Sequence, residues 1–205
     1  MEPVIPHSDE IATSWWGQSW CQNIEKYADY KTRLFRGKHY ILSGAVIDLK
    51  IQKGKIISRV QGNRKAPYCV EIRISRLSEE RIQSIMKQCS QKIENMEELI
   101  NGNFPDDLKD LFTGDEGLFP NPTEINYFCS CPNWALMCKH VAATLYGVAV
   151  RFDENPFLFF ELRGIDIDRF IDIALKSRVE MMLDHSNTLT SRVIDDDKVF
   201  DIFKF

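Results

Sequence analysis

The sequence lacks every long apolar segment that a membrane protein would need. It has no run of 18 apolar residues, and its first ten residues (MEPVIPHSDE) are polar and acidic and do not follow a signal-peptide pattern. These absences argue against membrane-spanning helices and a secretory leader. With 44% hydrophobic and 27% charged residues, the composition is that of a globular protein. We therefore expect a cytoplasmic protein without a membrane partner.

Motifs that carry catalytic chemistry are also missing. The chain has no glycine-rich phosphate loop of the Walker type and no G-x-G-x-x-G sequence. It has four histidines, and no serine or cysteine comes with a matched histidine that could activate it. His39, beside Lys38, is the one central histidine without another assignment, and a single imidazole does not make a catalytic site. We therefore predict that the protein is not an enzyme.

What the chain does contain is one dense group of potential metal ligands. Four of its ten Cys and His residues fall within twelve positions: Cys129, Cys131, Cys138 and His140. The pattern C-x-C-x6-C-x-H offers three thiolates and one imidazole, which is a full tetrahedral ligand set for Zn²⁺. Because this set leaves no open coordination position, we predict one zinc ion with a structural role.

The residues around this group favour the same interpretation. Residues 125–129 are apolar and β-prone, and Pro132 helps to break the strand into a knuckle, so that both cysteines of C-x-C can face one ion. From Lys139 onward the sequence is helix-prone. Cys138 and His140 would then lie at the start of a helix, where the helix dipole favours a thiolate.

Three alternatives stay open. The cysteines and the histidine can be ordinary core residues, or two cysteines can form a disulfide, although a C-x-C pair is too short for easy closure. A catalytic zinc would need an open position and a general base, for which Glu124 is the nearest candidate. Cys21, Cys69 and Cys89 sit apart among apolar neighbours, and we interpret them as buried thiols.

The cysteine and histidine pattern, followed by a helix, resembles the SWIM zinc finger. Four further segments, TSWWGQSW, FRGKHYILSGAVIDLKI, RVQGNRKAPYCVEIRI and ENPFLFFELRG, resemble small bacterial SWIM-finger proteins, so that the resemblance covers roughly residues 13–165. Such proteins are often encoded beside Swi/Snf-type helicases. The resemblance therefore implies a zinc finger, and as a partner a helicase of this type or another DNA-processing machine.

Positive charge is concentrated in one part of the chain. Residues 31–81 contain 13 Lys and Arg against 4 Asp and Glu, whereas the whole protein has a net charge of −4. Such a block is typical of a nucleic-acid surface. The alternative is a solvated sheet face, where basic side chains also protect edge strands. We select as candidate nucleic-acid contacts Arg33, Arg36, Lys38, Arg64, Lys65 and Lys139.

The periodicity predicts an α+β fold. We expect a helix over residues 15–30, an antiparallel meander of about three strands over residues 40–75, a helix from Leu77 and a helical stretch near 93–101. A helix over residues 166–183 precedes an acidic and aromatic tail. The predicted division is an N-terminal α+β domain (1–123), the SWIM finger (124–165) and a helical C-terminal segment with the tail (166–205).

These features lead to two hypotheses of different classes. The first is a zinc-binding module that contacts nucleic acid, with DNA favoured over RNA, as an accessory to a helicase or another DNA-processing machine. The second is a protein–protein adaptor with a purely structural zinc site and no nucleic-acid contact. A nucleic-acid interface would require salt-dependent binding, and an adaptor would not.

Overall fold

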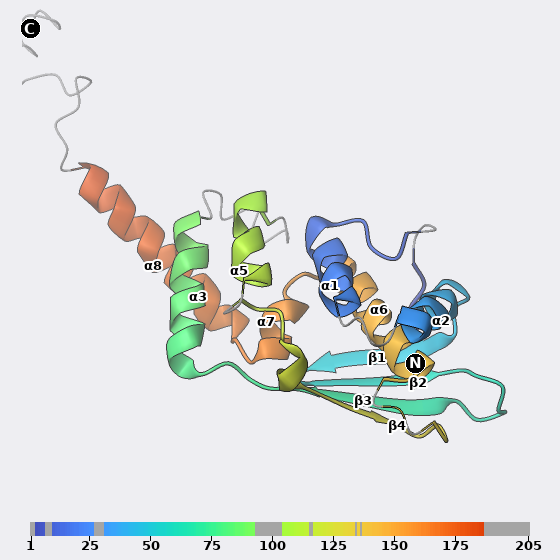
Figure 1. Cartoon of the computed structure of the whole chain (residues 1–205). Helices are drawn as coiled ribbons and strands as arrows, with labels where there is room; N and C mark the ends of the chain where they lie inside the picture. The colour runs from blue at the N-terminus through green and yellow to red at the C-terminus, as the bar shows by residue number, and fades with distance from the viewer. Residues whose placement is uncertain are drawn as a thin grey trace, which may run out of the picture.

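The computed structural model describes residues 3–6, 10–26, 31–92, 104–114, 117–133, 135 and 137–186. The fold is α+β, as predicted: a four-stranded antiparallel sheet with helices (Figure 1). The strands are β1 (Val46–Gln52), β2 (Lys55–Val60), β3 (Tyr68–Ile74) and β4 (Ile125–Cys129). The helices are α1 (Trp15–Glu25), α2 (Lys31–Leu42), α3 (Glu79–Lys92), α5 (Lys109–Thr113), α6 (Lys139–Glu154), α7 (Leu158–Arg163) and α8 (Ile167–Ser186), with 3-10 turns η2 (Asp106–Leu108) and η3 (Pro122–Glu124).

The sheet follows the chain, in the order β1-β2-β3-β4. A tight turn joins β1 to β2, and Gly54 takes a positive φ of 73° there, which a residue with a Cβ rarely adopts. The three-stranded meander is confirmed. The strand predicted to enter the finger also forms, and it pairs with β3 in the same sheet, with Val70 opposite Cys129. The two predicted segments therefore share one sheet, while their division into domains stays a prediction.

One prediction about the N-terminal half is wrong. The first strand was expected to begin at residue 40, but residues 31–42 form the helix α2 and β1 begins at Val46. The helix forms because Leu34, Gly37 and Ile41 recur at helical spacing and are all buried. Helix α1 ends at Glu25, short of the predicted residue 30, and residues 27–30 lie outside the described part of the chain.

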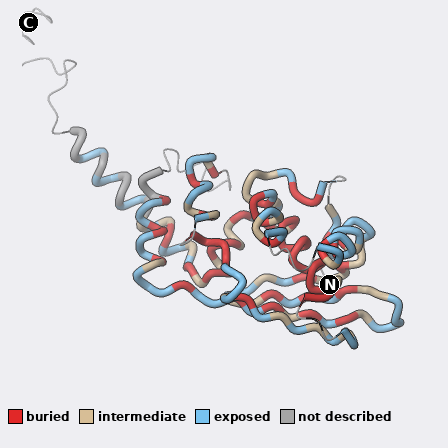
Figure 2. Tube along the Cα trace, in the orientation of Figure 1, coloured by how far each residue is buried: buried red, intermediate tan, exposed pale blue. Residues whose placement is uncertain are grey.

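The described helices lie on one side of the sheet or beyond one end of it (Figure 1). Helix α6 packs against all four strands, and α7 packs against β1. The helix predicted from Lys139 onward forms, and every residue from His140 to Val150 is buried. Helices α1 and α2 cover α6 on the side away from the sheet, so it runs through the centre of the core, and Figure 2 shows it in red.

The N-terminal tryptophans belong to this core. Trp20 is almost fully buried, and Trp15 and Trp16 are half-buried. Each indole donates a hydrogen bond to a distant backbone carbonyl: Trp15 to Phe104 (3.0 Å), Trp16 to Phe152 (3.0 Å) and Trp20 to Leu145 (2.9 Å). The tryptophans thus fix α1 onto α6 and onto the segment before α5, and they are part of the core.

Helices α3 and α8 pack against each other beyond one end of the sheet, as Figure 1 shows. The helix predicted from Leu77 forms as α3, and its apolar residues Ile82, Ile85, Met86 and Cys89 are all buried. The helical stretch predicted near 93–101 and the C-terminal tail lie outside the described residues. Among the helices that the structure does describe, none combines the length and the apolarity needed to cross a bilayer.

A buried ion pair connects α7 to the sheet. The Arg163 side chain is 1% exposed, and it donates to the Glu124 carboxylate (2.8 Å) and to the Ser75 carbonyl (2.7 Å). Partial burial acts to raise the pKa of Glu124, but the hydrogen bonds from Arg163 and from the Asn121 backbone N–H outweigh it, so that the pKa is lowered from 4.5.

This pair predicts a pH-dependent contribution to stability. Because the pKa of Glu124 is lower in the folded state, its contribution is complete above about pH 4.5 and is lost as the pH falls through the folded value. Glu124→Gln should lower the free energy of unfolding by about 1–2 kcal/mol at pH 7. Urea denaturation of both proteins between pH 7 and pH 3 should show this difference shrinking with acid, and a constant difference would contradict the assignment. Glu80→Gln, on the exposed side of α3, is the control.

Candidate metal centre

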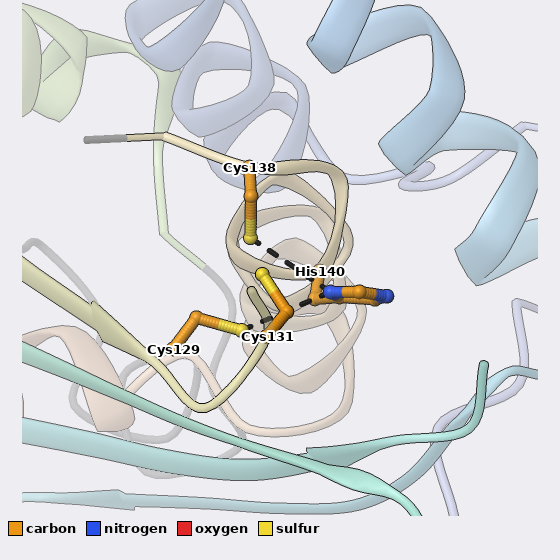
Figure 3. A group of neighbouring side chains, drawn as sticks. All are labelled: Cys129, Cys131, Cys138 and His140. Atoms are coloured by element: carbon orange, nitrogen blue, oxygen red, sulfur yellow. Dashed lines mark hydrogen bonds between the residues drawn. The ribbon is translucent and has the colours of Figure 1, made fainter. Parts of the chain in front are cut away.

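Three elements place the four predicted ligands around one point (Figure 3). Cys129 ends strand β4, and the backbone N–H of Ser130 donates to the Cys69 carbonyl (3.0 Å), so the turn that follows is anchored to β3. Cys131 lies in that turn. Cys138 is the N-cap of α6, with extended backbone angles, and His140 is the second residue of the helix. The predicted positions of Cys138 and His140 at the helix start are confirmed.

The distances fit a tetrahedral metal site. One ligand atom from each of the four residues lies within 4.8 Å of all the others, and His140 Nδ1 is 3.8 Å from Sγ of both Cys129 and Cys138. Zn–S bonds of about 2.3 Å and Zn–N bonds of about 2.0 Å would give tetrahedral edges of about 3.5–3.8 Å. All six cysteines are free thiols, so the disulfide alternative is wrong. The cluster can therefore hold a metal ion.

The electrostatics of the cluster favour a thiolate at Cys138. The Cys129 thiol and the Val141 backbone N–H donate to Cys138, hydrogen bonds with His140 and Cys131 act in the same direction, and together they lower the pKa of Cys138 to about 3 despite partial burial. The pKa of Cys129 is raised, chiefly because its proton is shared with the Cys138 sulfur. A metal ion binds the deprotonated thiols, so it would displace this shared proton.

A second layer of contacts fixes the His140 ring. Its face stacks on Tyr68, with the ring centroids 4.2 Å apart and the planes 25° apart, and the Tyr40 ring packs edge-on at 5.6 Å. The His140 carbonyl accepts from Thr144 Oγ1 (3.0 Å), which in turn bonds Ser58 of β2 (2.5 Å). The first turn of α6 is therefore held to the sheet with Nδ1 directed at the sulfur atoms.

Tyr40 and Tyr68 were not predicted to be parts of the site. Tyr40 was assigned to the first strand of the meander, and Tyr68 to one face of its last strand. Metal-ligand spacing reveals the four ligands, whereas the rings that surround a ligand come from elements brought together by the fold. The first ring comes from α2 and the second from β3, so no local pattern in the sequence marks them.

Three of the candidate nucleic-acid contacts surround the cluster. Arg33 donates to the Met137 carbonyl (3.0 Å), next to Cys138. The Lys139 ammonium lies over the Tyr40 ring, 4.6 Å from its centroid, and the Arg64 guanidinium lies over the Tyr68 ring at 5.1 Å. Arg33, Arg64 and Lys139, which we call the cationic rim, thus come from α2, the β2–β3 connection and the start of α6.

The other candidates are placed differently. Arg36 and Lys65 are exposed, and in the sequence they lie close to the rim members Arg33 and Arg64, respectively. Lys38 faces away from the cluster, since it lines a hollow of about 320 Å³ together with Cys21, Glu25 and Tyr146. Arg33, Arg36 and Lys38 were expected on the meander or its turns, and they lie instead on α2.

Two further predictions concern the three cysteines outside the cluster and the candidate base Glu124. Cys89 is buried and Cys21 half-buried, but Cys69 is exposed, so the expectation of three buried thiols is wrong for Cys69, which points from β3 away from the helices. Glu124, the candidate base of a catalytic zinc, immediately precedes β4, whereas Cys129 ends this strand. Its carboxylate pairs with Arg163. The absence of enzymatic activity stays a prediction.

Comparison with known proteins identifies a relative. No family model matches the chain, and no solved structure gives a significant match. The chain is similar to the uncharacterized protein Rv2102 of Mycobacterium tuberculosis (strain ATCC 25618 / H37Rv), with 35% identity over 156 residues. These residues make up 75% of this chain but 56% of the relative, so the chain spans little more than half the length of that protein.

Proposed function

We propose that this protein is a zinc-binding module of the SWIM-finger type that contacts nucleic acid through the cationic rim. The observation that carries the proposal is the position of the rim: each of its three cations is held one residue or one ring away from a metal ligand. Arg33 binds the residue before Cys138, Lys139 lies between Cys138 and His140, and Arg64 lies over the ring that stacks on His140.

The charge distribution around the metal centre supports an anionic ligand. Helix α2, the connection from residue 61 to 67 and the knuckle from residue 130 to 140 contain seven Lys and Arg and no Asp or Glu. The acidic residues that make the whole protein negative lie elsewhere in the sequence. A surface of this kind attracts the phosphate backbone, which provides most of the affinity for nucleic acid independently of base sequence.

The Cys3His set supports zinc as the metal. Thiolate and imidazole ligands suit a borderline-soft ion, and a four-residue set without an open position is typical of structural zinc sites. Bound zinc would supply four fixed bonds between the end of β4 and the start of α6. Cys129, Cys131, Cys138 and His140 would hold it, so that the segments carrying Lys139 and Met137 keep their positions beside α2.

The resemblance to small SWIM-finger proteins supports a place beside a helicase or another DNA-processing machine. Co-purification of the tagged protein from its native host, followed by identification of bound protein and nucleic acid, tests this part of the proposal. Recovery of a Swi/Snf-type helicase would support it. Recovery of neither a helicase nor DNA would remove the accessory role.

The nucleic-acid contact has a direct test in its salt dependence. Fluorescence titration of labelled duplex and single strands should show affinity falling with salt, at a log–log slope of about −0.9 for each phosphate neutralised on duplex and about −0.7 on single strands. Arg64→Glu/Lys65→Glu should weaken binding about tenfold or more for all sequences and flatten the slope, because it removes two phosphate partners. Zinc content should be unchanged.

A matched control separates this site from net charge. Lys109→Glu/Lys176→Glu makes the same change in charge at exposed positions on α5 and α8, and it should leave the slope unaltered. If both double variants weaken binding equally, the rim is not the site. If the wild-type protein binds no nucleic acid at low salt, the nucleic-acid proposal fails.

The adaptor alternative would then lead, and one observation favours it. The face of the sheet that none of the described helices covers exposes two large apolar side chains, Phe128 (63% exposed) and Ile57 (38% exposed), which flank Glu71 in the same cross-strand row. Exposed apolar groups on a sheet mark a protein-binding surface more often than a phosphate-binding one.

A further inference from the structure

The aromatic residues around His140 form a continuous connection between the metal centre and the cationic rim. The Tyr68 ring stacks on the imidazole, and the Arg64 guanidinium lies over the same Tyr68 ring. The Tyr40 ring contacts the imidazole edge-on, and the Lys139 ammonium lies over the Tyr40 ring. Two members of the rim are thus supported by rings whose position depends on the orientation of one metal ligand.

The packing leaves these rings little freedom to move independently. His140 is 4% exposed and Tyr68 is 9% exposed. A Cβ built on Gly62 would lie 2.6 Å from the Tyr68 ring and 3.4 Å from His140 Nε2, so the backbone of the connection that carries Arg64 rests directly on both rings. A change in the orientation of the imidazole must therefore displace Tyr68, the backbone at Gly62, or both.

We propose that Tyr68 and Tyr40 act as positioning residues that transmit metal occupancy to the cationic rim. Metal binding at Nδ1 withdraws electron density from the imidazole and strengthens its attraction to the Tyr68 π face. The loaded site then fixes His140, Tyr68 and residues 61–67 in one arrangement. Without the metal, the imidazole lacks the bond at Nδ1, and the backbone that presents Arg64 and Lys65 is held less firmly.

Linkage makes this connection reciprocal. If metal binding orders residues 61–67 through Tyr68, then removal of the Tyr68 ring must lower the affinity for the metal by the corresponding factor. Contacts around a metal ligand typically contribute 10- to 100-fold to metal affinity, so we expect a loss of about tenfold. The inference rests on the proposed function only for the identity of the ligand that the rim would bind.

The test compares Tyr68→Leu, which removes the aromatic ring, with Tyr68→Phe, which keeps it. Competition with a zinc chelator should give a wild-type zinc affinity for Tyr68→Phe and an affinity about tenfold weaker for Tyr68→Leu. At saturating zinc, hydrogen exchange of residues 61–67 should be faster in Tyr68→Leu than in Tyr68→Phe, while exchange in β1 stays unchanged. Tyr146→Leu is the control, because its buried hydroxyl bonds Glu25 on the α1 side of α6.

Each outcome decides the inference separately from the proposed function. Equal zinc affinities for Tyr68→Leu and Tyr68→Phe, or equal exchange of residues 61–67 in both at saturating zinc, would overturn it. An equal loss of zinc affinity in Tyr146→Leu would also overturn it, since any buried tyrosine would then suffice. Because neither measurement includes nucleic acid, a protein that shows this coupling but binds no DNA or RNA would retain the inference and lose the proposed function.

Discussion

Cys138→Ala and His140→Ala should each abolish stoichiometric zinc binding and the cooperative folding of residues 127–147. Either change removes one of four ligands from a set without a replacement, since Glu124 at the far end of β4 is engaged by Arg163. The apparent binding free energy of a structural zinc site is about 10–16 kcal/mol, and it contributes directly to folding. Zinc analysis of the purified variants should fall from one ion per chain to nearly none.

The structural consequence should be local at first. Hydrogen exchange should increase from the end of β4 through the first turns of α6, because the proposed metal would be bonded to ligands from both segments. Cys69→Ser provides the control: this thiol is exposed on β3 and lies outside the ligand set, so zinc content and exchange should match those of the wild type. Full metal retention in Cys138→Ala or His140→Ala would refute the ligand assignment.

Gly37→Val should produce the second large effect, a loss of about 3 kcal/mol in the free energy of unfolding. Gly37 is where α2 crosses α6, and a Cβ there would lie 2.5 Å from the Ala142 Cβ and 2.8 Å from the backbone of Ala142 and Ala143. Backbone atoms cannot rotate away, so the two helices must separate. The gain in helix propensity on replacing glycine, at most about 1 kcal/mol, does not offset this cost.

Urea denaturation followed by tryptophan fluorescence measures the loss, since Trp15, Trp16 and Trp20 lie in the core beside α6. Because α2 also carries Arg33 and Tyr40, the separation should weaken zinc binding as well. Thr32→Val, on the exposed side of α2, is the matched control and should stay within about 0.5 kcal/mol of the wild type. A wild-type stability for Gly37→Val would show that the helices do not cross this closely.

The parts of the structure that could be predicted from sequence are those encoded locally. The ligand spacing identified the four residues of the cluster, and the strand alternation of residues 68–74 and the apolar spacing of α3 identified their elements. The start of α6 could be placed because the C-x-H pair can share a metal only where a helix begins.

The helix α2 could not be recognised in the same way. Its buried side includes Gly37, which is unfavourable in an isolated helix and is retained because α6 approaches closely at that point. Tertiary packing therefore overrides local propensity in residues 31–42. The error mattered for the site, since it placed Arg33 on the sheet, whereas the helix brings it to the Met137 carbonyl.

The rings around His140 were beyond sequence reasoning for a related reason. Tyr40 lies 100 positions before His140 in the sequence, and Tyr68 lies 72 positions before it. The packing of α2, β3 and α6 brings both rings into contact with the imidazole. Nothing in the local pattern of either tyrosine distinguishes a ring that supports a metal ligand from any other half-buried aromatic residue.

X-ray absorption spectroscopy at the zinc edge tests the central claim most directly, because it reports the ligand atoms and their distances in the intact protein. We expect one zinc per chain with three sulfur ligands at about 2.3 Å and one nitrogen ligand at about 2.0–2.1 Å. Loss of the zinc signal in Cys138→Ala would agree with this assignment. A wild-type spectrum dominated by oxygen ligands, or a purified protein that takes up no zinc, would contradict it.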